Sequence, residues 1–192
     1  MKSSKFFNAI ILTVTFLVGH SLVAQGKMMK EDTKMVGGAA MYPSKNIVEN
    51  AVNSKDHTTL VAAVKAAGLV DVLSSDGPFT VFAPTNKAFD KLPSGTVDNL
   101  LMKENKSTLA TILKYHVVSG KWNAKNIMEM IEKGNGTYKI ETVSGGWLNA
   151  SVKGKHVYVS DESGNSAKVT IADVNQSNGV IHVIDAVLLP KQ

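Results

Sequence analysis

Apolar positions follow a helical spacing in the first half of the chain and an alternating spacing in the second half. Between residues 46 and 133 they recur every three or four positions, in short segments that end at glycine or proline, as is typical of amphipathic helices. From Tyr138 onward apolar and polar residues alternate between glycine-containing turns, which predicts antiparallel strands. Helices followed by strands indicate the α+β fold class.

The predicted elements are short and are separated by turn residues. Asn46 caps the first helix, and either Asp56 or Thr58 caps the second. Further helices are predicted at residues 96–102 and 107–117 and between Trp122 and Gly134. Strands are predicted at residues 138–143, 147–152, 156–160, 167–173 and 180–184. The last run is almost continuously apolar, as expected of a strand that is buried on both faces.

One strand is predicted early in the chain, and it leads directly into a helix within residues 80–93. Phe82 favours a strand, whereas Pro84 has no N–H for a ladder and therefore ends it. Thr85 or Asn86 then accepts a hydrogen bond from the first free amides of the helix. That helix carries Ala88, Phe89 and Leu92 and ends at Pro93. We predict a structural role for this junction, because it contains no nucleophile, metal cluster or phosphate loop.

The N-terminus has the features of a secretory signal peptide. Two lysines precede an apolar run, and a small residue that a signal peptidase accepts follows it. The run is shorter than the ~20 residues that span a bilayer, which favours a cleaved signal at residues 1–24 over a retained membrane helix. Residues 25–45 contain several charges and Gly37-Gly38, which predicts a flexible linker. Residues 46–190 then suit one domain.

Every basic residue is a lysine, and the chain has no cysteine. The missing cysteine excludes disulfides and lipid attachment through an N-terminal cysteine. Without the signal, 19 lysines face 16 acidic residues, a net charge of +3. Because guanidinium groups make the commonest specific contacts to guanine, their absence argues against sequence-specific binding of nucleic acid. The lysines are spread along the chain, which favours a solvated surface over an anion-binding patch.

The motifs of common enzymes are missing from the sequence. It contains no His-Glu-x-x-His, no Gly-x-Ser-x-Gly, no phosphate-loop pattern and no cysteine nucleophile. We therefore predict no enzymatic activity, no cofactor and no metal. The competing hypothesis is a catalytic or metal site built from residues that are distant in sequence, such as His116, His182 and Asp173.

Three segments, in this order, resemble the fasciclin domain family. Residues 80–93 resemble its N-terminal signature, residues 113–120 its tyrosine-histidine motif, and residues 178–190 its C-terminal signature. The resemblance implies a fasciclin-like wedge of two β-sheets flanked by several α-helices, with the two signatures adjacent in the core. It also implies an extracellular adhesion or matrix role and, in bacteria, a secreted surface or biofilm-associated protein.

Four residues are candidates for adhesion or binding. Tyr115 and His116 match the motif to which the family's adhesion is credited, although the apolar stripe around His116 favours a packed, hydrogen-bonded histidine. Some animal members of the family carry an integrin-recognition segment just before the C-terminal signature. Asp173 and Val174 fit that segment, but the asparagine that follows replaces a large apolar residue, so integrin binding is not expected.

The other signature residues are predicted to be structural. They are Phe82, Pro84, Thr85, Asn86, Phe89, Asn178, Gly179 and His182. His182 lies in an apolar run, which favours a buried histidine that links its strand to a neighbouring helix over a metal ligand. Asn86 is expected to act as a helix cap rather than as a ligand contact.

Together these features predict a secreted, non-enzymatic fasciclin-like module for cell adhesion or for interaction with extracellular matrix or polysaccharide. The expected partner is an extracellular or cell-surface protein or a polysaccharide, with no nucleic acid and no membrane span in the mature chain. The alternative is a periplasmic small-ligand carrier or stress-related protein, whose pocket would be lined by Trp122, Trp147 or the methionines. The expected location is secreted, either extracellular or periplasmic, and the oligomeric state stays open.

Overall fold

The computed structural model describes residues 32–191. The predicted signal peptide and the first part of the predicted linker lie outside these residues. The helices are α1 (Ile47–Ala51), α2 (Thr58–Ala67), α3 (Val70–Ser74), α4 (Asn86–Phe89), α5 (Thr96–Leu100), α6 (Lys106–Tyr115) and α7 (Ala124–Lys133), with short 3-10 helices η1 (Lys55–His57) and η2 (Lys103–Asn105). The strands are β1 (Lys34–Val36), β2 (Ala39–Met41), β3 (Phe79–Pro84), β4 (Val117–Ser119), β5 (Thr137–Glu141), β6 (Trp147–Lys153), β7 (His156–Ser160), β8 (Ser166–Gln176) and β9 (Gly179–Ile184).

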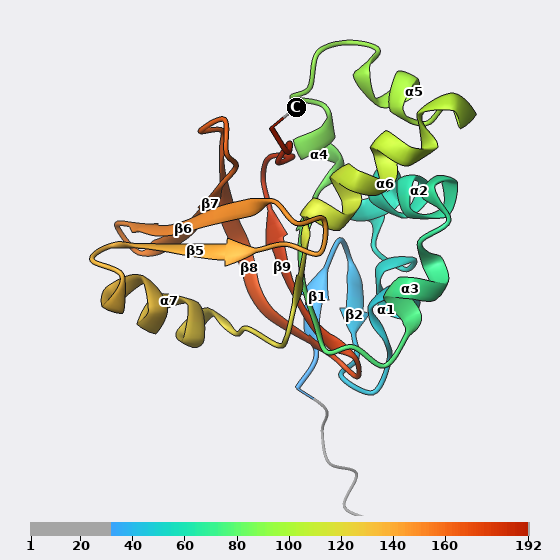
Figure 1. The fold of residues 1–192 in the computed structure, drawn as a ribbon. Helices are drawn as coiled ribbons and strands as arrows, with labels where there is room; N and C mark the ends of the chain where they lie inside the picture. The colour runs from blue at the N-terminus through green and yellow to red at the C-terminus, as the bar shows by residue number, and fades with distance from the viewer. Residues whose placement is uncertain (1–31, 192) are drawn as a thin grey trace, which may run out of the picture. The chain divides into compact units, whose positions relative to one another are not determined.

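Seven strands form one sheet in the order β4-β3-β9-β8-β7-β6-β5, and β1 and β2 form a separate hairpin. β3 and β9 pair in parallel, with Phe82 opposite His182, and the other neighbouring strands are antiparallel. The long strand β8 pairs with β7 near its start and with β9 from Val169 onward, and its register is irregular between Val169 and Val174. Such irregularities bend a strand, and β5 and β6 run across the direction of β8 and β9 (Figure 1). The predicted α+β fold and the adjacency of the two signature strands are confirmed.

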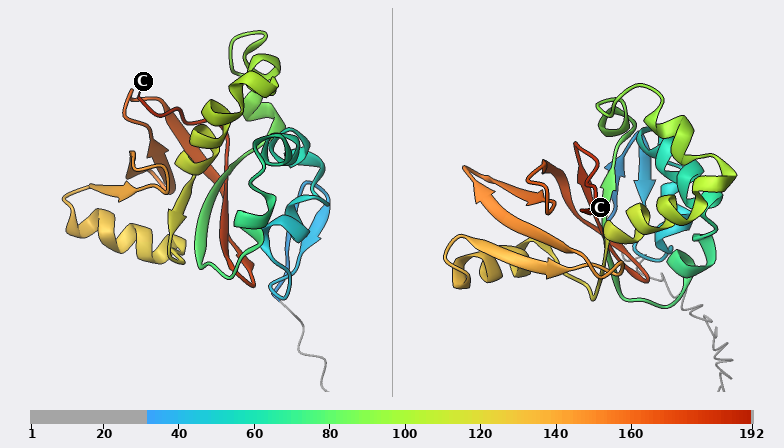
Figure 2. Two further views of the ribbon diagram at one scale, coloured as in Figure 1. Left: turned by 45° about the vertical axis from the view of Figure 1, so that its right-hand side comes forward. Right: turned by 45° about the horizontal axis from the view of Figure 1, so that its top comes forward.

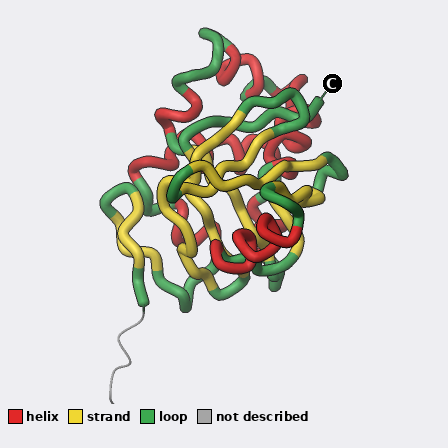
Figure 3. The backbone as a smooth tube through the Cα atoms, turned by 90° about the vertical axis from the view of Figure 1, so that its left-hand side faces the viewer, coloured by secondary structure: helices red, strands yellow, loops and turns green. Residues whose placement is uncertain are grey.

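Two groups of buried apolar side chains hold the helices against the sheet. The first group includes Leu60, Val81 and Leu113 and lies among α1, α2, α3, α6, β3 and β9. The second group includes Ile127 and Leu148 and lies between α7 and strands β5 to β8. Figures 1 and 2 show this separation, with α7 against β5 and β6 and the other helices gathered beside β3. In Figure 3, where the left-hand side of Figure 1 faces the viewer, α7 (red) lies beside the strands (yellow).

The hairpin β1–β2 contradicts the flexible linker predicted for residues 25–45. Val36 and Met41 are buried in the first core, and Gly37 and Gly38 supply the positive φ angles of the turn between the two strands. Each strand has only three residues, so no sustained alternation marks them in the sequence. The linker prediction is therefore wrong from residue 34 onward, because packing against the domain stabilises this segment.

The observed helix boundaries match the predicted ones where a polar side chain caps the helix, and they differ from the predicted ones elsewhere. Asn46 caps α1 with a reciprocal capping box, because its side chain accepts from the Glu49 N–H while the Glu49 carboxylate accepts from the Asn46 N–H. The cap predicted at Asp56 or Thr58 is wrong, because η1 leads directly into α2. The helix predicted over residues 107–117 ends at Tyr115, since the next residues pair with β3 as β4.

Candidate functional site

The three signature segments meet at Phe82, which is fully buried at the centre of β3. Its ring stacks on the imidazole of His182 from β9, with the ring centroids 5.6 Å apart. Its backbone N–H donates to the carbonyl oxygen of His116 at 2.9 Å. Residues that are a hundred positions apart in the sequence therefore share one interior.

His116 is a packed and hydrogen-bonded histidine, the arrangement that the apolar stripe favours. Its Nε2 accepts from the Leu188 N–H at 3.1 Å, so Nδ1 carries the proton and donates to the Ile112 carbonyl at 2.8 Å. Burial disfavours the charged ring and lowers the pKa of His116 from 6.5 to about 4, although the Ile112 bond and the charge of Asp161 oppose this. The ring is neutral at pH 7, and both of its nitrogens are occupied.

His182 is buried in the same way and links three parts of the chain. Its Nδ1 accepts from the Asp173 N–H on β8 at 3.3 Å, so Nε2 carries the proton and donates to the Trp122 carbonyl at 2.8 Å. Trp122 lies just before α7, so the bond reaches the segment that leads into the helix. Burial also lowers the pKa of His182 below its ordinary value.

Tyr115 lies wholly inside the domain. The hydroxyl donates to the Trp147 carbonyl at 2.7 Å and accepts from the Glu162 N–H at 3.3 Å. Burial is the main reason that its pKa rises to about 12. The ring also lies against Gly146, where an added Cβ would come within 2.7 Å of it. Tyr115 therefore connects α6 to the strands of the β half.

The junction after β3 uses both of the proposed capping residues, but for different purposes. Thr85 is the cap of α4, since its hydroxyl accepts from the Ala88 N–H at 3.3 Å. The expectation that Asn86 caps this helix is wrong, because Asn86 is the first residue of α4 and its side chain binds an earlier segment. Its amide donates to the Lys55 carbonyl at 2.9 Å, and its carbonyl oxygen accepts from the Thr59 N–H at 3.0 Å. Pro84 is buried as the last residue of β3, and Phe89, the last residue of α4, packs partly buried against the first core.

Asn178 and Gly179 hold the start of β9 in place. The buried Asn178 side chain accepts from the Ile47 N–H at 3.0 Å and donates to the Leu73 and Ser75 carbonyls at 2.9 Å and 2.8 Å. A Cβ at Gly179 would lie 2.1 Å from the Phe79 carbonyl oxygen, so only glycine permits the close approach of β3. Both residues serve the scaffold.

The structure does not bring the four adhesion candidates together on one surface. Tyr115, His116 and Val174 are buried, and Asp173 is half-buried. Asp173 has a φ of 55° and accepts from the Ala124 N–H, the first residue of α7, at 2.7 Å. The exposed part of Asp173 borders a shallow polar groove whose other residues are Asp32, Lys34, Lys121, Asn123, Lys125 and Asn175. Of these four residues, only Asp173 is exposed enough to contact a partner directly.

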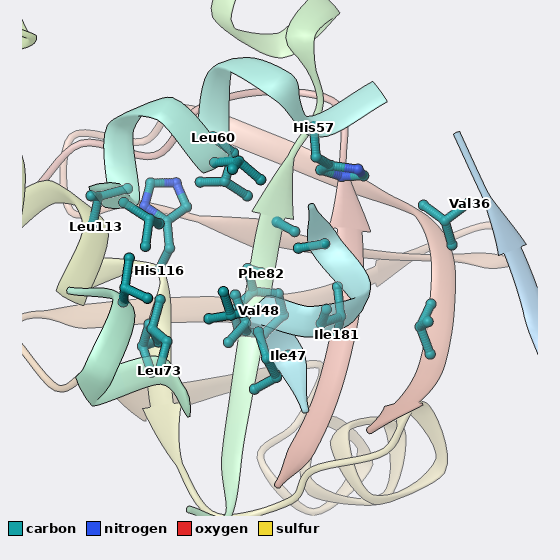
Figure 4. Close-up of a pocket in the computed structure, with 18 of the residues that line it drawn as sticks. Val36, Ile47, Val48, His57, Leu60, Leu73, Phe82, Leu113, His116 and Ile181 are labelled. Atoms are coloured by element: carbon teal, nitrogen blue, oxygen red, sulfur yellow. The ribbon is translucent and has the colours of Figure 1, made fainter. Parts of the chain in front are cut away.

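An apolar cavity of about 60 Å³, which no sequence pattern indicates, lies inside the first core. Aliphatic side chains from α1, α2, α3, β1, β3 and β9 surround it, together with Phe82 and the rings of His57 and His116 (Figure 4). His57 Nδ1 is hydrogen-bonded to the Ser54 hydroxyl at 2.9 Å, whereas its buried Nε2 has no hydrogen-bond partner. Of the residues predicted to line a ligand pocket, the methionine Met41 borders this cavity, whereas Trp122 and Trp147 do not.

The buried histidines and Asp173 do not form the catalytic or metal site of the competing hypothesis. The ring nitrogens of His116 and His182 are bound to backbone groups, which leaves no lone pair or proton for a substrate. Within residues 32–191, no three histidine or acidic side chains lie close enough together to hold a metal ion. No helix in the same residues has the length and apolar character needed to cross a membrane.

The sequence was compared with those of known protein families. The sequence pattern that defines the family described as "Fasciclin domain" matches residues 55–190. This chain belongs to the fasciclin domain family. The matched residues include the three signature segments that meet at Phe82. The family pattern therefore covers the residues that build the interior of the domain.

Relatives of this fasciclin protein occur in bacteria and animals. Protein sll1483 of Synechocystis is 44% identical over 191 residues, which cover 99% of both chains. Immunogenic protein MPB70 of Mycobacterium bovis is 39% identical over 73% of this chain and 66% of its own length. Among solved structures, a FAS1 domain pair from the insect cell adhesion molecule fasciclin I has a TM-score of 0.53 and 27% identity, covering 68% of this chain and 43% of that chain.

Proposed function

We propose that this protein is a secreted, non-enzymatic adhesion module that binds extracellular matrix, a cell-surface protein or a polysaccharide. The observation that carries the proposal is the burial of the signature residues. His116 and His182 use all four ring nitrogens for contacts within the protein, and Tyr115 uses its hydroxyl in the same way. The signature residues thus serve the scaffold, and binding is left to the exposed surface.

Two further observations support this function. The similar solved structure comes from a protein described as a cell adhesion molecule, and its likeness covers 68% of this chain. The N-terminal sequence has the charge and apolar pattern of a secretory signal, which would bring the domain to the cell surface or the medium. An adhesion module needs a stable scaffold and an accessible surface but no catalytic cleft.

Immobilised protein provides the test. The purified chain is coated on a surface, and the attachment of cells from its native source and the retention of their exopolysaccharide are measured. The control is an unrelated secreted protein of similar size and net charge. We expect attachment or retention clearly above the control. Values equal to the control for both cells and polysaccharide would reject the adhesion function.

The cavity in the first core favours a second candidate function, the carriage of a small apolar molecule. Its lining is apolar apart from the two histidines and Lys65, and such cavities accept small apolar guests. A guest that binds only the folded state raises the melting temperature, and the rise grows roughly with the logarithm of the guest concentration once that exceeds Kd. Xenon and short-chain alcohols are suitable probes, and Ala51→Leu, which fills part of the cavity, is the matched variant. A melting temperature that is unaffected by every probe would remove this candidate.

A further inference from the structure

The sheet face that points away from α7, which we call the open face, is formed by β5, β6, β7 and the start of β8. Glu141 lies opposite Trp147 on this face, and Tyr158 lies opposite both Ser151 and Lys168 on its two neighbouring strands. Residues directly opposite each other in a sheet point to the same side, so these five share one face. None of them is buried, and Trp147 is 39% exposed. The alternate residues Ile140, Leu148 and Val159 are buried toward α7.

Two aromatic rings on the open face each have a lysine ammonium beside them. The Nζ atom of Lys139 is 5.9 Å from the centroid of the Trp147 ring, and that of Lys153 is 5.4 Å from the centroid of the Tyr158 ring. Lys168, opposite Tyr158, adds a third positive charge. Strand pairing thus gathers lysines that look scattered along the sequence.

The two ring–lysine pairs lie far enough apart to contact one extended molecule at two points. Tyr158 is opposite Ser151, which is four residues further along β6 than Trp147. At ~3.4 Å per residue the two rings are separated by about 14 Å along the strand. Asn149 lies between them on β6 and Ser151 lies beside Tyr158; both are partly exposed and offer hydrogen bonds.

We infer that the open face binds an acidic polysaccharide, with sugar rings stacked on Trp147 and Tyr158 and carboxylates paired with the neighbouring lysines. This inference rests on the proposed adhesion function and names its ligand class and its site. The face matches such a chain in three respects. Its flat aromatic rings can stack on the C–H faces of the sugars, and its amide and hydroxyl groups can hydrogen-bond to the sugar hydroxyls. Its lysines can pair with the sugar carboxylates. Charge complementarity carries the choice of an acidic polymer, because Glu141 is the single acidic residue within β5, β6 and β7.

Other polymers fit the open face less well. The centre of a protein interface is usually apolar, whereas polar residues separate Trp147 from Tyr158 on this face. Sequence-specific recognition of nucleic acid relies largely on arginine, and the chain has none.

Titration of the purified chain with alginate, a polymer of uronic acids, tests the inference. The open-face variant combines Lys139→Gln, Lys153→Gln and Lys168→Gln. The control variant combines Lys55→Gln, Lys87→Gln and Lys103→Gln. It changes the net charge by the same amount, but at exposed lysines outside the open face. We expect the open-face variant to bind alginate about tenfold more weakly at low salt, with a shallower dependence on salt. The control variant should bind as the natural protein does.

A second pair of variants tests the aromatic contribution. Trp147→Ala should weaken alginate binding about fivefold. Tyr42→Ala is the matched control, because the Tyr42 ring is also exposed and also has a lysine, Lys45, at 5.1 Å, but lies outside the open face. Tyr42→Ala should leave binding unchanged. All variants are compared at equal folded fraction, as measured by thermal melting.

The outcomes separate this inference from the proposed function. Equal alginate binding by the open-face and control variants would overturn the site and leave adhesion standing. Equally strong binding of neutral dextran would overturn the acidic ligand class, and preference for anionic lipid vesicles over alginate would reassign the face to a membrane surface. If no alginate is bound but immobilised protein still attaches cells, only the inference fails, whereas failure in both assays rejects the adhesion function as well.

Discussion

Mild acid should destabilise this domain, because it buries three histidines in their neutral form. Burial is the largest cause of the lowered pKa of His57, His116 and His182, and for His116 the folded value is about 4. Above pH 6.5 His116 is neutral in both the folded and unfolded states. Between pH 6.5 and about 4, the unfolded state binds a proton that the folded state does not, so the free energy of unfolding falls as the pH falls.

The pKa of His116 sets the size of this effect. Its change from 6.5 to about 4 corresponds to about 3 kcal/mol once both states are protonated. About 2 kcal/mol of this is already lost near pH 5. His57 and His182 act in the same direction, so the total loss should exceed the share of His116. For a domain of this size, such a loss is a large part of the free energy of unfolding.

Urea unfolding at a series of pH values measures the effect, with His116→Gln as the comparison. Glutamine retains one donor and one acceptor but has no proton to titrate, so the variant should be less stable at pH 7 and should lose less stability between pH 7 and about pH 5. The expected difference in that loss is about 2 kcal/mol. Identical pH dependence in the two proteins would refute the assignment of His116 as a buried neutral histidine.

Three further substitutions separate scaffold from surface. Phe82→Ala should cost about 3–5 kcal/mol through the cavity it leaves, and an unchanged melting temperature would contradict its place in the core. Asn178→Ala should lower the free energy of unfolding in urea by about 2–4 kcal/mol, because the Ile47 N–H and two carbonyls lose their buried partner. A decrease of less than about 1 kcal/mol would count against those hydrogen bonds. Trp147→Ala should change stability by less than about 1 kcal/mol, and a larger drop in melting temperature would show that its ring supports the fold.

Local patterns predicted the elements that carry a strong local signal. Asn46 was identified because a cap and its reciprocal partner lie within one turn, and the alternation from Tyr138 onward is visible because one side of those strands is buried. The parallel pairing of β3 with β9 could not be obtained from periodicity, since it joins segments a hundred residues apart. The resemblance to the fasciclin family predicted only that the two signatures lie adjacent in the core.

The remaining features depend on tertiary contacts that local sequence does not encode. The strands of the β1–β2 hairpin are too short to show a period, and α6 ends early because β3 offers hydrogen bonds to the residues that follow. The lysines of the open face come from separate strands, so the sequence showed them only as scattered charges. Candidate residues taken from the family motif proved to be parts of the scaffold, apart from the exposed portion of Asp173.

We propose that buried signature residues hold the scaffold, while an exposed surface makes the contacts of adhesion. The most direct measurement is cell attachment to immobilised Tyr115→Phe, which keeps the buried ring and removes only the hydroxyl bonded to Trp147 and Glu162. We predict a loss of about 1–2 kcal/mol in stability and unchanged attachment at temperatures where the variant is folded. Loss of attachment by a fully folded Tyr115→Phe protein would contradict the account.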